Sequence, residues 1–304
     1  MREAFAEAVY EAASRDPSIY IVVADMSPAG AIKKFAEEWP QRFVNVGVAE
    51  QNMIGVSAGL AMRGLRPFAY TIATFSLYRP FEMIRDDLCY QNLPVTVVGM
   101  GSGVVYSTLG GTHHAQEDIA IAGAIPNMRV LTPSDPLEVR RSVEYCATQS
   151  EGPVYLRFGK AGEATVTADA VDPWAFGKLR YIRRGNDACV MTHGAIMRRA
   201  IEVAEHLEAQ GKSVSLVSAH TLKPLDADGV AAVLASHDQV IVVEEHAPQG
   251  GLAAKTKQIA WDTGASCDLR TFTLKDEFIH CYGSHDEILE AHGLGLEEIV
   301  AGIQ

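Results

Sequence analysis

The stretch "VNVGVAEQNMIG", residues 44–55, joins the end of a β-type segment to the start of a helical one. Valines and Gly47 lead to Glu50, and behind it apolar and small residues recur at helical spacing. A strand that turns directly into a helix is the repeating unit of α/β proteins. The stretch therefore predicts an α/β fold, with the Glu50 carboxylate at the strand end, where such folds carry functional groups.

The same alternation of β-rich runs and amphipathic helices extends in both directions from this stretch, which is typical of mostly parallel sheets with helices on both faces. In the first half, strands are expected at 19–25, 42–47, 66–73, 94–100, 128–133 and 153–159, and helices at 2–15, 50–63, 79–91, 116–124 and 135–149. In the second half, strands are expected at 188–194, 213–219, 239–245 and 269–274, and helices at 195–210, 226–236 and from 250 onward.

A polar stretch with no sustained period separates the two halves. We therefore expect two domains, at residues 1–165 and 186–304, joined by a linker at 166–185. Loops after the strands of the first domain are the candidate site, and they lie at 25–30, 47–50, 73–78, 100–115 and 157–162. Asp25, in the first of these loops, is a candidate substrate-binding residue.

Composition excludes several classes of function. The chain has 304 residues, 48% of them hydrophobic, and a formal net charge of -12, which opposes binding to nucleic-acid phosphates. No apolar run approaches the 18 or more residues of a membrane helix, and the N-terminus lacks a signal-peptide pattern. The five cysteines form no CxxC pair, which favours a reducing compartment. We expect a cytoplasmic protein that binds neither nucleic acid nor membrane.

Glu50 has two interpretations. The first is a surface acid at a helix start, stabilised by the helix dipole by less than ~1 kcal/mol. The second is a buried functional carboxylate, which the following helix favours. That helix contains five small residues, Gly55, Ser57, Ala58, Gly59 and Ala61. Small residues in a helix allow another backbone to approach closely, which suggests a helix pair across a subunit interface.

An aromatic cluster follows the third expected strand. Phe75, Tyr78 and Phe81 are spaced by three residues around the start of a helix. Such spacing is typical of a core stripe, and we keep that interpretation for Phe81. Phe75 comes directly after the strand end, so its ring could offer a face to a flat ligand.

The loop "GSGVVYSTLGGTHHAQEDIA", residues 101–120, contains adjacent histidines after two glycines. Neighbouring residues cannot both face one point, so at most one histidine is expected to reach a site. With no third ligand at metal spacing, no metal site is expected. We expect His113 to act in acid-base chemistry or substrate binding, and His114 could instead cap the helix. The chain has no GxGxxG, P-loop, GxSxG or HExxH motif.

Taken together, these segments resemble the C-terminal half of the transketolase family. The matching pieces include "VGVAEQNMIGVSAGLA", "GGTHHAQEDIAIAGAIPNMRVLTPSDPLEVR", "GPVYLRFGK" and "VVEEHAPQGGLA", in the family's order and over nearly the whole chain. The resemblance implies a pyrimidine-binding domain followed by a transketolase C-terminal domain. It also implies thiamine diphosphate as the cofactor and a two-carbon ketol or acyl transfer between small carbonyl compounds.

The resemblance assigns roles to individual residues. Glu50 corresponds to the glutamate that hydrogen-bonds N1′ of the cofactor's aminopyrimidine, which enables its 4′ nitrogen to take the C2 proton. Phe75 would stack on the pyrimidine, and Tyr78 would help to wall the pocket. His113 would hydrogen-bond the bound substrate.

The diphosphate-binding half of the family is missing from this sequence. That half carries a GDG motif and a later asparagine that hold the metal and the diphosphate, and this chain contains no GDG. We therefore expect a separate N-terminal, diphosphate-binding subunit that holds Mg²⁺ (or Ca²⁺), most simply in an α2β2 assembly.

The sequence also departs from the family at the substrate end. Leu109 stands where sugar-phosphate transketolases have an aspartate, and Gly101 and Ala29 replace a phosphate-binding histidine and serine. Arg2 and Arg157 match the family's phosphate-side arginines. An apolar Leu109 would leave a donor hydroxyl unpaired, so we expect a less hydroxylated donor, such as a 2-oxo acid, or a specialised acceptor.

Three alternatives remain open at this point. The chain could be the β subunit of a 2-oxo-acid dehydrogenase E1 or belong to an enzyme like 1-deoxyxylulose-phosphate synthase. It could also be a non-catalytic assembly or regulatory subunit that kept only the fold. The joint presence of Glu50, Phe75 and His113 argues against the last possibility, because the fold alone requires none of them.

Overall fold

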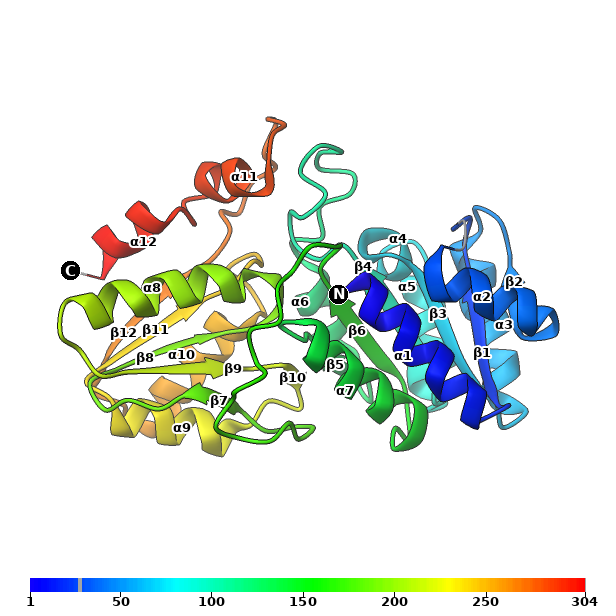
Figure 1. The fold of residues 1–304 in the computed structure, drawn as a ribbon, viewed down its shortest axis with the longest axis horizontal. Helices are drawn as coiled ribbons and strands as arrows, with labels where there is room; N and C mark the ends of the chain where they lie inside the picture. Colours follow the sequence, from blue (N-terminus) through cyan, green and yellow to red (C-terminus); the bar gives the residue numbers. More distant parts are fainter. Residues whose placement is uncertain (27–28, 304) are drawn as a thin grey trace.

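The computed structural model describes residues 1–26 and 29–303, which form two neighbouring sheets covered by helices (Figure 1). The first half contains α1 (Arg2–Arg15), β1 (Ile19–Val23), α2 (Gly30–Glu38), η1 (Pro40–Arg42), β2 (Phe43–Asn45), α3 (Glu50–Met62), β3 (Arg66–Ile72), α4 (Ala73–Leu77), α5 (Phe81–Met83), η2 (Ile84–Tyr90), β4 (Thr96–Met100), α6 (Asp118–Ala124), β5 (Arg129–Leu131), α7 (Pro136–Thr148) and β6 (Val154–Phe158).

The second half begins with a strand that runs antiparallel to its neighbour in the sheet. It contains β7 (Arg180–Arg183), β8 (Ala188–Thr192), η3 (Gly194–Ile196), α8 (Met197–Ala209), β9 (Val214–Ser218), β10 (Thr221–Lys223), α9 (Ala227–Ser236), β11 (Gln239–Val243), α10 (Leu252–Thr263), β12 (Asp268–Phe272), α11 (His285–Ala291) and α12 (Leu296–Gly302).

The first sheet has the order β10-β5-β6-β4-β3-β1-β2 and is parallel except for β10, which comes from the second half. Its central strands are apolar and buried on both faces, as parallel strands between helix layers require. Helices α1, α2 and α7 pack on one face, and α3, η2 and α6 pack on the other. The carboxyl ends of β1, β3 and β4 therefore open onto the loops that carry the candidate site.

The second sheet has the order β12-β11-β8-β9-β7 and is parallel except for β7. Helices α8, α11 and α12 pack on one face. On the other face α9 and α10 share one continuous hydrophobic core with α3 and α6 of the first half. The two halves are thus joined by shared core as well as by β10.

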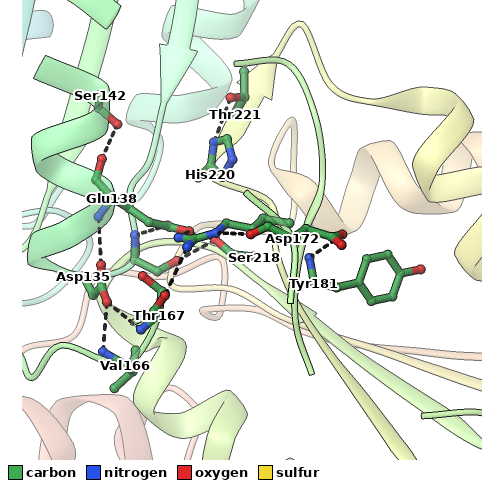
Figure 2. Close-up of polar contacts among 12 residues, drawn as sticks. Asp135, Glu138, Ser142, Val166, Thr167, Asp172, Tyr181, Ser218, His220 and Thr221 are labelled. Carbon is green, nitrogen blue, oxygen red and sulfur yellow. Dashed lines mark hydrogen bonds and ion pairs between the residues drawn. The ribbon is translucent and has the colours of Figure 1, made fainter. Parts of the chain in front are cut away.

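A buried polar network also joins the halves (Figure 2). Asp135 caps the start of α7 by accepting from the Glu138 N–H, and its other oxygen accepts from the N–H groups of Val166 and Thr167 at 2.9 and 2.8 Å. The fully buried Glu138 carboxylate accepts from Ser218 Oγ at 3.0 Å and from Arg180 Nη1 at 3.2 Å. Side chains of α7 are thereby bonded directly to β7 and to the end of β9.

The predicted α/β class and all the expected strands are confirmed. The expectation of an unstructured stretch at 166–185 missed β7, whose two-residue alternation is too short to distinguish from a loop. The expected helix at 79–91 is a short α5 followed by the π-helix η2. Residues 27–28 of the predicted loop 25–30 lie outside the described residues.

Candidate active site

Glu50 is the first residue of α3 and is only 6% exposed, which excludes the surface-acid interpretation in this chain. Its Oε1 accepts a 2.6 Å hydrogen bond from Arg79 Nη1. Arg79 lies in the turn between α4 and α5, 29 positions away in sequence. The sequence offered no partner for this carboxylate because the partner is brought by a separate strand-to-helix unit.

Phe75, in α4, lies at the centre of the same cluster. The Arg79 guanidinium carbon is 4.2 Å from the centroid of the Phe75 ring. The His113 ring approaches Phe75 edge-on, with centroids 5.1 Å apart and an interplanar angle of 67°. The structure thus brings Glu50, Phe75 and His113 together, and Arg79 is the member that sequence reasoning missed.

His113 is half-buried, and its Nδ1 lies 2.9 Å from Thr112 Oγ1. Burial, followed by the positive charge of Arg79, lowers the pKa of the His113 imidazole. At neutral pH the ring is therefore uncharged and can either donate or accept a hydrogen bond. His114 is buried, and neither of its ring nitrogens has a hydrogen-bond partner in the described part of the chain. Leu109, in the same loop, is half exposed.

Tyr78 makes its polar contact away from Glu50. Its hydroxyl donates to Glu117 Oε2 at 2.9 Å, at the start of α6. Burial, with the nearby Asp118 and Glu117 carboxylates, raises the pKa of this phenol above its usual range, so it stays protonated. Tyr78 therefore ties α4 to α6, beneath the loop that carries His113.

Arg2 lines a separate cavity of about 320 Å³ at the carboxyl end of β1. The same cavity is lined by Tyr70, Ala29 and the carboxylate-bearing Glu3. Asp25 is exposed beside it, has a left-handed φ of 48°, and its N–H donates to Asn45 Oδ1 at 3.3 Å. Arg2 and Asp25 thus both lie near the carboxyl end of β1, where Val23 also lines the cavity.

Arg157 requires a correction. The sequence predicted a substrate-binding arginine, but this side chain is 1% exposed. Its Nε donates to Asp118 Oδ2 at 2.8 Å, and its Nη2 donates to the Glu245 carbonyl at 2.8 Å. A guanidinium held in this way within the protein cannot contact a substrate without breaking a buried ion pair. Arg157 joins β6, α6 and the second half.

Glu50 and Phe75 fit a flat ring that carries an N–H donor. The Arg79 guanidinium is itself planar and cationic, and it lies on the face of Phe75 while it donates to Glu50. A planar donor can therefore reach the stacking face and the buried carboxylate at the same time. The aminopyrimidine of thiamine diphosphate has this shape and this polarity.

Across residues 1–26 and 29–303, no group of three or more His, Cys, Asp or Glu side chains is arranged to hold a metal ion. Within the same residues, every helix is too short or too polar to cross a membrane.

Comparisons with known proteins agree with this geometry. The family model described as "Transketolase, pyrimidine binding domain" matches residues 1–162, and the one described as "Transketolase, C-terminal domain" matches residues 177–299. A putative transketolase C-terminal section of Methanocaldococcus jannaschii is 32% identical over 304 residues, covering 100% of this chain and 95% of that protein.

A second relative and a solved structure extend over similar lengths. The 6-deoxy-6-sulfo-D-fructose transketolase subunit SqwH of Clostridium sp. is 31% identical, covering 99% of this chain and 92% of that protein. A solved structure described as "Split gene transketolase, inactive beta4 tetramer" has a TM-score of 0.88 and 32% identity, covering 100% of this chain and 96% of that one. The chain therefore belongs to the transketolase family, in which it corresponds to the C-terminal section of the split form.

Proposed function

We propose that this chain is the pyrimidine-binding subunit of a thiamine-diphosphate-dependent transferase that moves a two-carbon ketol or acyl unit between small carbonyl compounds. The observation that carries the proposal is the cluster of Glu50, Phe75, Arg79 and His113, which offers a stacking face and a buried acceptor to one planar donor. When bound, the cofactor supplies a nucleophilic carbon and an electron sink.

Glu50 would accept a hydrogen bond from the pyrimidine. Its 6% exposure keeps water away, so a hydrogen bond formed there is stronger than one formed in solvent. Phe75 would fix the plane of the ring by stacking. Tyr78, whose hydroxyl bonds to the start of α6, would support Glu50 and Phe75 and form a wall of the pocket.

His113 would bind the substrate. An uncharged imidazole beside Phe75 can donate to a carbonyl or hydroxyl oxygen and can accept a proton during transfer. Its neighbour Leu109 would contact the donor chain, and Arg2 and Asp25 would lie at the far end of the substrate.

We propose that the chain works only with a separate diphosphate-binding subunit that holds Mg²⁺ (or Ca²⁺), in an α2β2 assembly. The similar solved structure is described as an inactive β4 tetramer of a split gene transketolase. In this chain α3 exposes Gly55 and Gly59, and a Cβ added at either would meet no atom within 4 Å. Val48 and Met62, also exposed, flank these glycines. Such a surface is suited to contact with another subunit.

The domain assignment stays as expected from the sequence, with domains at 1–165 and 186–304 and the linker at 166–185. The two family models match residues 1–162 and 177–299, so the change from one to the other lies near this linker. A cytoplasmic location is also proposed, and the five free cysteines support it.

The substrate is expected to be specialised. Leu109 is 47% exposed in the loop of His113, where it offers no polar group to a polyol. The Clostridium relative is named for a sulfonated sugar. We therefore propose a donor other than an ordinary pentose phosphate.

The test is turnover by this chain mixed with its diphosphate-binding partner, identified by a GDG motif and a later asparagine in a neighbouring reading frame. Xylulose 5-phosphate, 6-deoxy-6-sulfofructose and pyruvate are compared as donors, with a lipoyl domain as an alternative acceptor. We expect activity only in the mixture and weak use of xylulose 5-phosphate. Full turnover by the chain alone would refute the split assignment, and rapid acylation of the lipoyl domain would favour an E1 β subunit.

A further inference from the structure

The loop that carries Leu109 and His113, residues 101–117, is held at its neck by a side chain of the second half. The neck is a β-bridge between Gly103 and Ala115. Glu245, two residues after the end of β11, accepts from the Val104 N–H at 2.7 Å. Gly103 has φ +57°, and a Cβ there would lie 2.5 Å from the Glu245 carboxyl group. The glycine therefore allows Glu245 to pack directly against the neck.

Glu245 is in turn held by the start of α11. It is 2% exposed, and its Oε1 also accepts from His285 Nε2 at 2.8 Å. Burial lowers the pKa of the His285 imidazole, but the Glu245 carboxylate outweighs this and leaves it above its usual value. Asp286 and Arg198 face His285 from α11 and α8, and Arg157 lies beside Glu245. One oxygen thus accepts from the loop N–H and also contacts the His285 imidazole.

The segment just before α11 contacts the tip of the same loop. A Cβ added at Gly110 would lie 2.9 Å from Tyr282 Cε1, and one at Gly111 would lie 3.7 Å from Phe278 Cδ1. Tyr282 and Phe278 are 72% and 65% exposed, so core packing does not account for their position. The loop (teal) and this segment (orange to red) rise on the same side of the molecule (Figure 1).

We propose that residues 278–285 together with Glu245 form a brace that positions the His113 loop, with Tyr282 at its tip and the Glu245–His285 pair at its neck. The brace makes the C-terminal domain part of substrate binding, although the side-chain contacts described for Glu50, Phe75 and His113 are with residues of the first half. The functional half of this inference rests on the proposed role of His113. Tyr282, Glu245 and His285 are positioning residues.

The structural half is tested by hydrogen–deuterium exchange of the full chain, read on peptides that cover residues 101–117. In Tyr282→Ala and in His285→Gln we expect these peptides to exchange faster than in the wild type, while peptides from the sheets do not change. Trp261→Ala, which removes another highly exposed aromatic ring of the same domain, is the matched control. Tyr282→Phe keeps the packing on Gly110 and should restore protection. Unchanged loop exchange in both variants would overturn the brace.

The functional half is tested with the reconstituted complex. Small misplacements of a binding group can cost up to about 100-fold in rate, and we expect kcat/KM for the donor to fall about tenfold in Tyr282→Ala. Exchange of the cofactor's C2 proton, which depends on Glu50, should not change. If His113→Ala impairs turnover but Tyr282→Ala loosens the loop without affecting kcat/KM, the brace is overturned. If His113→Ala itself has no effect, the proposed role of His113 fails, and the exchange experiment still decides whether the brace exists.

Discussion

At the scale of single residues, Arg79 decides how accessible the candidate site is. It occupies the two groups proposed to bind the aminopyrimidine, the face of Phe75 and the carboxylate of Glu50. The Arg79 side chain is 48% exposed, so releasing it into solvent involves little loss of packing. If the cofactor's ring uses the same face of Phe75 and the same oxygen of Glu50, its binding displaces Arg79 from the present position.

Replacing Arg79 with alanine should therefore tighten cofactor binding. A partly exposed ion pair contributes about 0.2–1 kcal/mol and a cation–π contact about 0.5–1 kcal/mol. Removing both competing contacts should lower the Kd for thiamine diphosphate about 3- to 30-fold in the reconstituted complex, as measured by calorimetry. Arg85→Ala, which removes an exposed pair with Asp86, is the control. Weaker binding in Arg79→Ala would mean that this arginine contributes to holding the cofactor.

Because His220 is buried, we expect the stability of the fold to decrease at low pH. His220 is buried against Trp174, and burial, followed by the charge of Arg180, lowers its pKa to about 3. The unfolded chain takes up a proton near pH 6.5, whereas the folded chain does not, so stability is complete above pH 6.5 and falls as the pH drops toward 3. The free energy of unfolding, measured in urea, should fall less steeply between pH 7.5 and 4.5 in His220→Phe than in the wild type. The exposed His280→Phe should keep the wild-type slope, and an equal slope in all three would contradict the assignment.

At the scale of elements, most members of the candidate cluster could be predicted from the sequence because each signal is local. Glu50 follows a strand within one turn, and Phe75 and His113 lie in loops at strand ends. Arg79 and Glu245 could not be found in this way, because each acts on a loop from a distant part of the chain. The roles of β7 and of residues 278–285 also depend on tertiary contacts. Both segments are too short to show a periodic pattern of hydrophobic residues. Arg157 was misassigned because the sequence match did not reveal its burial.

The joint between α7 and β7 should be sensitive to one substitution. Arg180→Leu leaves the fully buried Glu138 carboxylate without its cationic partner. Breaking a buried pair from one side costs about 3–5 kcal/mol, and we expect a loss of that order in the free energy of urea unfolding. The double variant Arg180→Leu/Glu138→Leu should recover part of it, because no charge remains buried. Arg141→Leu, which breaks an exposed pair with Glu144, should cost less than about 1 kcal/mol. A similar small loss in Arg180→Leu would show that the pair does not hold the joint.

At the scale of the whole molecule, the proposed activity requires a second chain. The cluster around Glu50 would supply contacts for the pyrimidine only, and two relatives of similar length are named as a section and a subunit of a transketolase. The fold exposes α3, with Gly55 and Gly59 facing open space, beside this cluster. Subunit contact through α3 would place a neighbouring chain close to Glu50.

Gly59→Leu tests that contact. A Cβ at this position meets no atom of its own chain within 4 Å, so the variant should fold and unfold like the wild type. If α3 packs closely against another subunit, the added side chain should block assembly, which light scattering coupled to gel filtration would detect as a smaller species. Ala209→Leu, an exposed small-to-large change at the end of α8, is the control. Unchanged assembly in Gly59→Leu would place the subunit interface elsewhere.

The most direct test of the central claim is the rate at which the C2 proton of thiamine diphosphate exchanges with deuterium in the reconstituted complex, followed by NMR. The measurement needs no knowledge of the substrate and reports only on the group that Glu50 is proposed to activate. Because acid–base catalysis of this kind typically contributes 10²- to 10⁴-fold, we expect Glu50→Gln to slow exchange by about 100-fold or more, and the exposed Glu82→Gln to leave it unchanged. An exchange rate in Glu50→Gln within about twofold of the wild type would contradict the account.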